Sequence, residues 1–150
     1  DPANSAWALR SFAGNPAIGW KVAWSDRMIS FYFVTPVFGM VYAGLRAAGV
    51  RVKPLSWLAM GVLLAPLVLD GATHALNDLL TGMAGVGFRD TNRWLAVLTG
   101  NALPGFYAGD QLGSFNWWAR LFTGVVADGG VAFFTFPWLD RLIEQEFDQS

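Results

Sequence analysis

The sequence predicts an all-α membrane protein with about three transmembrane helices and additional short interfacial helices. Hydrophobic residues make up 54% of the chain and charged residues only 14%, well below the roughly 25% typical of soluble domains. Three segments are predominantly apolar over roughly 18 residues or more, the length that crosses a hydrocarbon core of about 30 Å. Residues 55–69 are uncharged and apolar on every side, so such a helix requires either a large protein core or lipid around it. A chain of 150 residues is too short to provide that core.

Charge and cysteine content exclude several classes of function. The formal net charge is −1, so electrostatics give no support for binding nucleic acid. The chain has no cysteine, which excludes disulfides, thiolate metal sites and cysteine nucleophiles. No dinucleotide-binding glycine motif, Walker loop or serine-elbow motif occurs. We predict that residues 1–150 form a single integral membrane domain in the lipid bilayer.

Aromatic and basic residues are interspersed in the first 26 residues, ahead of the first apolar segment. This mixture suits a membrane interface, where tryptophan and tyrosine are enriched. We predict Trp20 and Trp24 as interface anchors on that basis. The alternative is an ordinary extramembrane cap that packs on the helices.

The first predicted span covers about residues 28–45, with Pro36 near its middle. A proline is tolerated inside a membrane helix when neighbouring groups satisfy the freed carbonyl, and a kink is expected there. Three basic residues follow directly in the loop 46–53. Because short loops rich in lysine and arginine remain in the cytoplasm, we predict a cytoplasmic location for this loop.

The second predicted span covers about residues 55–76 and contains Pro66. Trp57, close to its start, is a predicted interface anchor. Residues 77–116 are rich in glycine, aspartate and asparagine and form the predicted outer loop.

A short internal repeat lies in and beyond the outer loop. Residues 88–100 resemble residues 112–124 at an offset of 24, with an asparagine, an aromatic residue and a Thr-Gly pair in register. Asp90-Thr91 and Ser114 are predicted helix caps ahead of the two apolar runs. The first run is too short to cross a bilayer, so we expect an interfacial helix or a re-entrant turn there.

The third predicted span covers about residues 117–139. Trp118 and Trp138 lie twenty residues apart, about 30 Å along a helix, which matches aromatic anchors at both interfaces. The acidic residues 140–150 form a predicted solvated tail. Three spans and a cytoplasmic first loop put this tail in the cytoplasm as well.

Asp128 lies midway between Trp118 and Trp138. A carboxylate at that depth costs on the order of 2.5–3.5 kcal/mol on insertion scales and is functional or paired by default. The alternative to a functional role is a hydrogen-bonded aspartate at a helix contact, with Gly129 and Gly130 admitting a close neighbour.

Asp70, Thr73 and His74 close the second span, and Asp70 and His74 share one helix face because they are one turn apart. Three functional roles are open: a metal site, a proton relay, or axial ligation of a tetrapyrrole by the imidazole. A metal site requires three or four ligands, of which only two are evident, whereas a tetrapyrrole requires a single histidine. The structural alternative is a hydrogen-bonded pair that ties the span to the outer loop.

Five short motifs follow one another along the chain: Arg10-Ser11-Phe12, Ser25-Asp26-Arg27-Met28, Asp70-Gly71-Ala72-Thr73-His74, Asn116 to Gly124, and Phe136-Pro137-Trp138-Leu139-Asp140. In this order they resemble a family of small predicted bacterial integral membrane proteins of unknown function. Asp70, Gly71 and Thr73 match the family's Asp-Gly-x-Thr motif, which closes its second span, and a Thr-Gly motif follows in the third. The resemblance implies an integral protein of a bacterial inner membrane and no particular activity.

The chain departs from this family at its cysteines. Asn4 and Ser5 stand where the family has a Cys-His pair, and Ser25 and Met28 stand at the two cysteines of its Cys-x-Arg-Cys motif. His74 replaces the family's usual glutamine. A metal or redox role of those thiols therefore does not transfer to this chain.

These observations favour a non-catalytic accessory or structural subunit of a larger bacterial membrane complex, such as a respiratory or photosynthetic assembly. One alternative is a small proton- or ion-linked transporter or membrane enzyme that uses Asp70, His74 and Asp128. A second alternative is a pigment-binding protein with His74 as ligand. The expected partners are the lipid bilayer and other membrane subunits, with a tetrapyrrole or a bound lipid as candidate cofactors.

Overall fold

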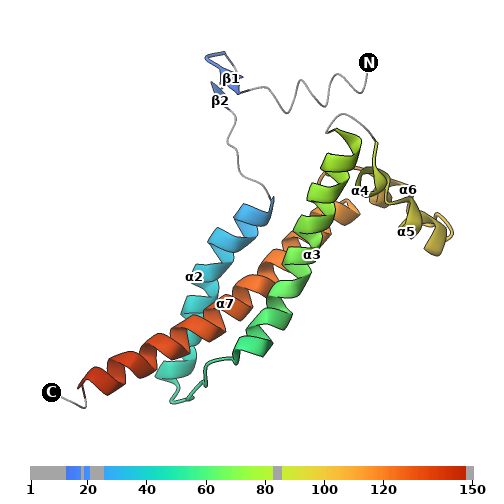
Figure 1. The fold of residues 1–150 in the computed structure, drawn as a ribbon. Helices are drawn as coiled ribbons and strands as arrows, with labels where there is room; N and C mark the ends of the chain where they lie inside the picture. The colour runs from blue at the N-terminus through green and yellow to red at the C-terminus, as the bar shows by residue number, and fades with distance from the viewer. Residues whose placement is uncertain (1–12, 18, 21–25, 83–85, 148–150) are drawn as a thin grey trace. The chain divides into compact units, whose positions relative to one another are not determined.

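The computed structural model describes residues 13–17, 19–20, 26–82 and 86–147, with the side chains of residues 26, 27 and 31 excepted. Three long helices dominate it (Figure 1): α2 (Asp26–Ala47), α3 (Trp57–Thr81) and α7 (Phe115–Phe147). Three short helices join α3 to α7, namely α4 (Phe88–Thr91), α5 (Arg93–Leu98) and α6 (Pro104–Tyr107). The predicted all-α class is confirmed. Its small exception is a two-residue antiparallel pair, β1 (Gly14–Asn15) and β2 (Gly19–Trp20).

All three long helices are long and apolar enough to cross a membrane, which points to a multi-pass membrane protein. Their apolar stretches are scarcely covered by the protein itself. The buried share of the apolar stretch is 12% in α2, 6% in α3 and 33% in α7. Apolar surface left uncovered on this scale marks contact with lipid or with another protein.

Helices α2 and α7 extend beyond the predicted spans at both ends, whereas α3 begins two residues later than predicted, at Trp57. The second span ends at Thr81 rather than near residue 76, and Gly82, with a φ of +64°, follows in the left-handed conformation that commonly ends helices. The acidic segment predicted as a tail is helical up to Phe147. Its helical residues 141–147 are exposed.

One of the two predicted caps is correct. The Ser114 hydroxyl accepts a hydrogen bond from the backbone N–H of Trp117 at 3.3 Å, as expected at the start of α7. The cap predicted at Asp90-Thr91 is wrong, because these residues lie inside α4 and Asn92 precedes α5. The Asp90 carboxylate instead accepts from the Gly87 N–H at 2.8 Å, at the start of α4.

The described residues group into two compact units. One contains the described residues before Asp26 together with residues 71–117, and the other contains residues 26–70 and the described residues from 118 onward. Both α3 and α7 contribute to each unit. We refer to them as the loop unit and the helix unit.

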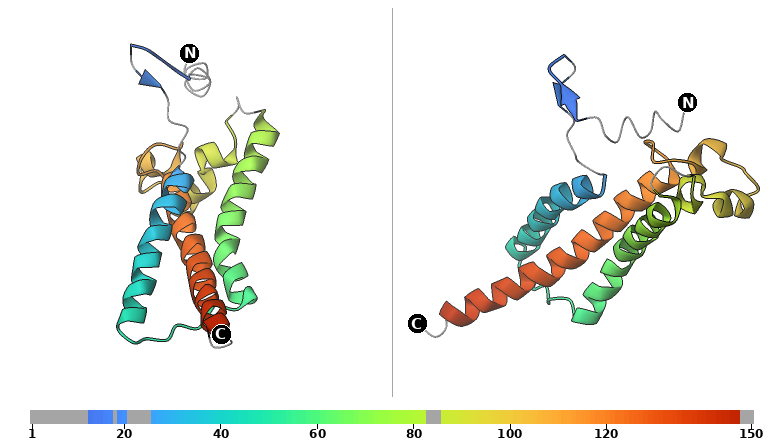
Figure 2. Two further views of the ribbon diagram at one scale, coloured as in Figure 1. Left: turned by 90° about the vertical axis from the view of Figure 1, so that its left-hand side faces the viewer. Right: turned by 45° about the horizontal axis from the view of Figure 1, so that its top comes forward.

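In the helix unit, α7 lies between α2 and the first half of α3 (Figure 2). Glycines allow this approach: a Cβ atom added to Gly129 would lie 3.1 Å from the Phe38 ring, and one added to Gly130 would lie 2.9 Å from Leu63 Cβ. Aromatic contacts extend the packing, as the rings of Trp57 and Phe134 are 4.4 Å apart. Small residues at the contact and large apolar residues around it are typical of membrane helix packing.

Candidate functional site

The loop unit places His74 against an arginine. His74 Nε2 lies 2.8 Å from a terminal guanidinium nitrogen of Arg89. Arginine can only donate hydrogen bonds, so this ring nitrogen accepts and is not available to a ligand unless Arg89 moves. Of the other residues predicted beside His74, Asp70 is buried and Thr73 is half-buried. Across the described residues, no group of three His, Cys, Asp or Glu side chains could hold a metal ion.

Asn77 connects α3 to the start of α4. Its amide nitrogen donates to Asp90 Oδ2 at 2.9 Å, and its Oδ1 accepts from the backbone N–H of Arg89 at 2.9 Å. The approach is so close that a Cβ atom on Gly87 would overlap the Asn77 carboxamide. This network holds Arg89 in place beside His74.

Asn92 and Asn116, which occupy equivalent positions in the internal repeat, meet in the structure. Asn92 Nδ2 lies 3.1 Å from Asn116 Oδ1, and both side chains are fully buried. Asn92 Nδ2 also lies 2.8 Å from the Arg89 carbonyl oxygen, to which Asn116 Nδ2 donates at 2.7 Å. The two copies of the repeat therefore contribute two buried amides that hydrogen-bond to the same backbone carbonyl, that of Arg89.

Arg89 is also held by an aromatic group. Its guanidinium carbon lies 5.7 Å from the centre of the Phe115 ring, within the range of a cation–π interaction. Sequence reasoning did not single out Arg89, Asn77, Asn92 or Asn116 as site residues. The internal repeat could have indicated Asn92 and Asn116. Nothing in the sequence indicates a contact between Asn77 and Arg89.

Asp128 is fully buried at the contact between α2 and α7 in the helix unit. The Thr35 hydroxyl donates to Asp128 Oδ1 at 2.6 Å, and the two neighbouring glycines admit α2 and α3. This is the helix-contact arrangement that the sequence offered as an alternative to a functional role. The second carboxylate oxygen, Oδ2, has no hydrogen-bond partner among the described residues.

The predicted tryptophan anchors lie on different elements. Trp57 is the first residue of α3, while Trp118 and Trp138 lie half-exposed on α7. Trp20 is exposed in β2. Trp24 lies outside the described residues.

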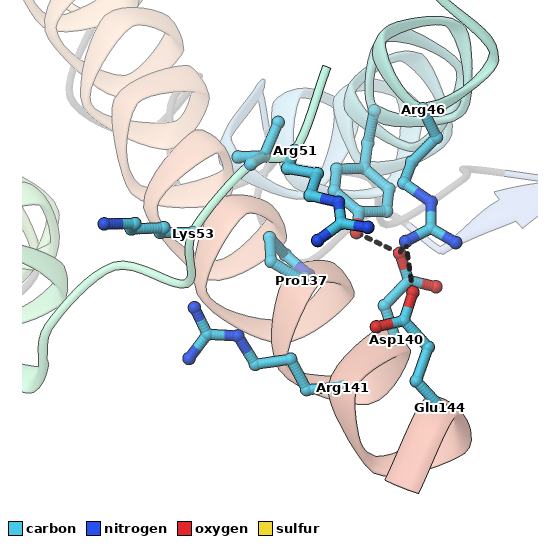
Figure 3. Close-up of a pocket in the computed structure, with 9 residues that line it drawn as sticks. Arg46, Arg51, Lys53, Pro137, Asp140, Arg141 and Glu144 are labelled. Carbon is cyan, nitrogen blue, oxygen red and sulfur yellow. Dashed lines mark hydrogen bonds and ion pairs between the residues drawn. The ribbon is translucent and has the colours of Figure 1, made fainter. Parts of the chain in front are cut away.

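A basic cleft of about 240 Å³ opens in the helix unit where α2, the segment after it and α7 come together. On one side, the Arg46 guanidinium bonds to Asp140 at 2.8 Å and to Glu144 at 3.1 Å (Figure 3). The Tyr42 hydroxyl donates to the same Asp140 carboxylate. The cleft also contains three further cations, Arg51, Lys53 and Arg141.

No protein-family model, curated protein or solved structure matches this chain.

Proposed function

We propose that this chain is a non-catalytic accessory subunit of a larger bacterial membrane complex. The observation that carries the proposal is that these polar side chains form hydrogen bonds with one another. His74 bonds to Arg89, Asp128 bonds to Thr35, and Asn92 bonds to Asn116. Side chains that bond to one another in this way stabilise the fold and specify its packing.

The exposed face of α3 supports a partner within the membrane. Gly61 and Ala65 are one turn apart and both are exposed, and nothing lies within 4 Å of a Cβ atom placed on Gly61. Two small residues at this spacing let a second helix approach closely, as at many membrane helix contacts. We propose this face as the contact with the neighbouring subunit.

Native purification tests the proposal. Tagged wild-type protein, extracted with a mild detergent, is expected to migrate with other subunits, and the partners are identified by mass spectrometry. A respiratory or photosynthetic energy-transducing complex is the assembly to look for first. Migration of the wild-type protein only as a free monomer would overturn the proposal.

A matched pair of variants tests the α3 face. The double variant Gly61→Leu/Ala65→Leu is expected to lose co-migration, since the larger side chains separate the two helices. Gly44→Leu is the control because Gly44 is also exposed, on α2, with nothing within 4 Å of its added Cβ. If both variants migrate with the other subunits to the same extent, this face of α3 is not the contact.

A proton- or ion-linked transporter is the second candidate, and Asp128 Oδ2 favours it. A fully buried carboxylate oxygen without a described partner inside an apolar helix is the kind of group that relays protons in membrane proteins. Asp128→Asn is expected to lower flux in proteoliposomes at least tenfold if this candidate is correct. Unchanged flux in Asp128→Asn, Asp70→Asn and His74→Gln would exclude it.

A further inference from the structure

Three cations in the basic cleft lack the partners that Arg46 has. Arg46 forms ion pairs with both carboxylates that line the cleft, Asp140 and Glu144. Among the described residues, no ion pair within 4 Å is formed by Arg51, Lys53 or Arg141. The cleft therefore has four cationic side chains against two carboxylates, and the excess positive charge favours an anion.

The cations come from two elements and line one cleft. Arg51 and Lys53 belong to the segment between α2 and α3, and Arg141 belongs to α7. In Figure 3, Lys53 and Arg141 lie across Pro137 from the Arg46 ion pairs. A phosphate group offers several acceptor oxygens, which lysine and arginine bind with charge-assisted hydrogen bonds.

An apolar groove begins one helical turn from this cleft. Its volume is about 390 Å³, and it is lined by apolar side chains and glycines, including Leu55, Leu63, Val126 and Phe133. Phe133 precedes Pro137 of the cleft by four residues on α7, so the two share a face. Leu55 follows Lys53 of the cleft by two residues.

A positive cleft beside an apolar groove fits an amphipathic anion. We propose that the cleft binds the phosphate headgroup of an anionic phospholipid through Arg51, Lys53 and Arg141, and that one acyl chain of this lipid lies in the groove. The cleft lies at the C-terminal end of the apolar stretch of α2, where a membrane helix reaches the headgroup region. Basic pockets between membrane helices are known to bind such headgroups.

Retention of lipid after extraction from the membrane tests this assignment. The full-length protein is reconstituted into nanodiscs of equal parts phosphatidylglycerol and phosphatidylcholine, released in mild detergent, and analysed by native mass spectrometry. We expect retained phosphatidylglycerol to exceed phosphatidylcholine. Arg141→Gln is expected to lower this preference about fivefold, and Arg51→Gln/Lys53→Gln/Arg141→Gln is expected to abolish it.

Arg93→Gln is the matched control, since it removes one exposed arginine from the loop unit and should leave lipid retention unchanged. Equal retention of the two lipids, or an equal effect of Arg93→Gln and Arg141→Gln, would overturn the proposal. Glycerol phosphate and inorganic phosphate are added as competitors. Displacement of phosphatidylglycerol by either at equal concentration would assign the cleft to free phosphate instead. If the triple variant loses its helical circular dichroism, the comparison of single variants still decides.

Discussion

At the scale of single residues, asparagine side chains form many of the hydrogen bonds that stabilise the loop unit. Asn92 lies at a φ of +42°, in the left-handed region that asparagine tolerates better than most residues. Its side-chain amide meets carbonyl groups of Arg89 and Tyr107. A buried amide that satisfies backbone carbonyls lets an irregular turn exist away from water.

Substitution of Asn92 separates the two contributions. Asn92→Gly keeps the left-handed backbone accessible but removes the amide, so we expect a loss of about 1–3 kcal/mol in the free energy of unfolding. Asn92→Ala is expected to lose about 1 kcal/mol more because of its Cβ atom. Asn101→Gly is the control, at an exposed asparagine with a φ of +59°, and should be neutral or slightly stabilising. Denaturant unfolding in detergent measures all three, and equal stability of Asn92→Gly and wild type would contradict the assignment.

Substitution of Gly87 tests the hydrogen bonds that Asn77 forms with Arg89 and Asp90. In Gly87→Ala the new Cβ atom would overlap the Asn77 carboxamide and displace it from Arg89 and Asp90. Overpacking of this kind costs about 1–3 kcal/mol. Gly105→Ala is the matched control, because nothing lies within 4 Å of its added Cβ. The melting temperature in detergent is expected to fall for Gly87→Ala alone.

At the scale of elements, the long helices each present two surfaces. Most apolar side chains of α2 and α3 are exposed, and the small residues Gly129 and Gly130 of α7 lie against Phe38 of α2 and Leu63 of α3. This pattern is the reverse of a soluble bundle, where the outward face is polar. In lipid, close packing rather than burial of apolar surface from water drives such helices together.

Gly130 is the sharpest test of the contact between α3 and α7. Gly130→Ala puts a Cβ atom 2.9 Å from Leu63 Cβ, which belongs to a helix and cannot simply rotate away. We expect the two helices to separate slightly and the free energy of unfolding to fall by about 1–3 kcal/mol. Gly44→Ala, at an open position on α2, should instead stabilise by up to about 1 kcal/mol through helix propensity. Unfolding in mixed micelles compares them, and a neutral Gly130→Ala would mean that the contact is loose.

At the scale of the whole molecule, the basic residues between α2 and α3 have two predicted uses. They are predicted to orient the chain by keeping this segment in the cytoplasm, and they line the cleft proposed to bind an anionic headgroup. Both uses follow from positive charge placed directly beside apolar helices. The cytoplasmic leaflet carries the anionic lipids that such charge attracts.

The absence of cysteine from the sequence makes the orientation easy to test. Ala48→Cys lies in the segment after α2 and is exposed, and Ala102→Cys lies in the segment between α5 and α6 and is also exposed. In intact cells, a membrane-impermeant maleimide is expected to label Ala102→Cys only. Labelling of Ala48→Cys before permeabilisation would reverse the predicted orientation.

The sequence by itself determined the helices and the apolar setting around them. Hydrophobicity over some twenty residues is a local property, so the presence of α2, α3 and α7 could be predicted from it. The ends were less well predicted. Ser114 was recognised as a cap, but α3 continues to Thr81 before the left-handed Gly82, and α7 continues to Phe147. The internal repeat indicated Asn92 and Asn116 without indicating that they would meet.

Only the tertiary structure decided the partners of the polar groups. Thr35 and Asp128 are 93 residues apart, and Arg89 lies 15 residues from His74. The basic cleft combines residues of α2, the segment after it and α7. Which donor meets which acceptor depends on how distant helices pack, and hydropathy along the chain contains no information about that packing.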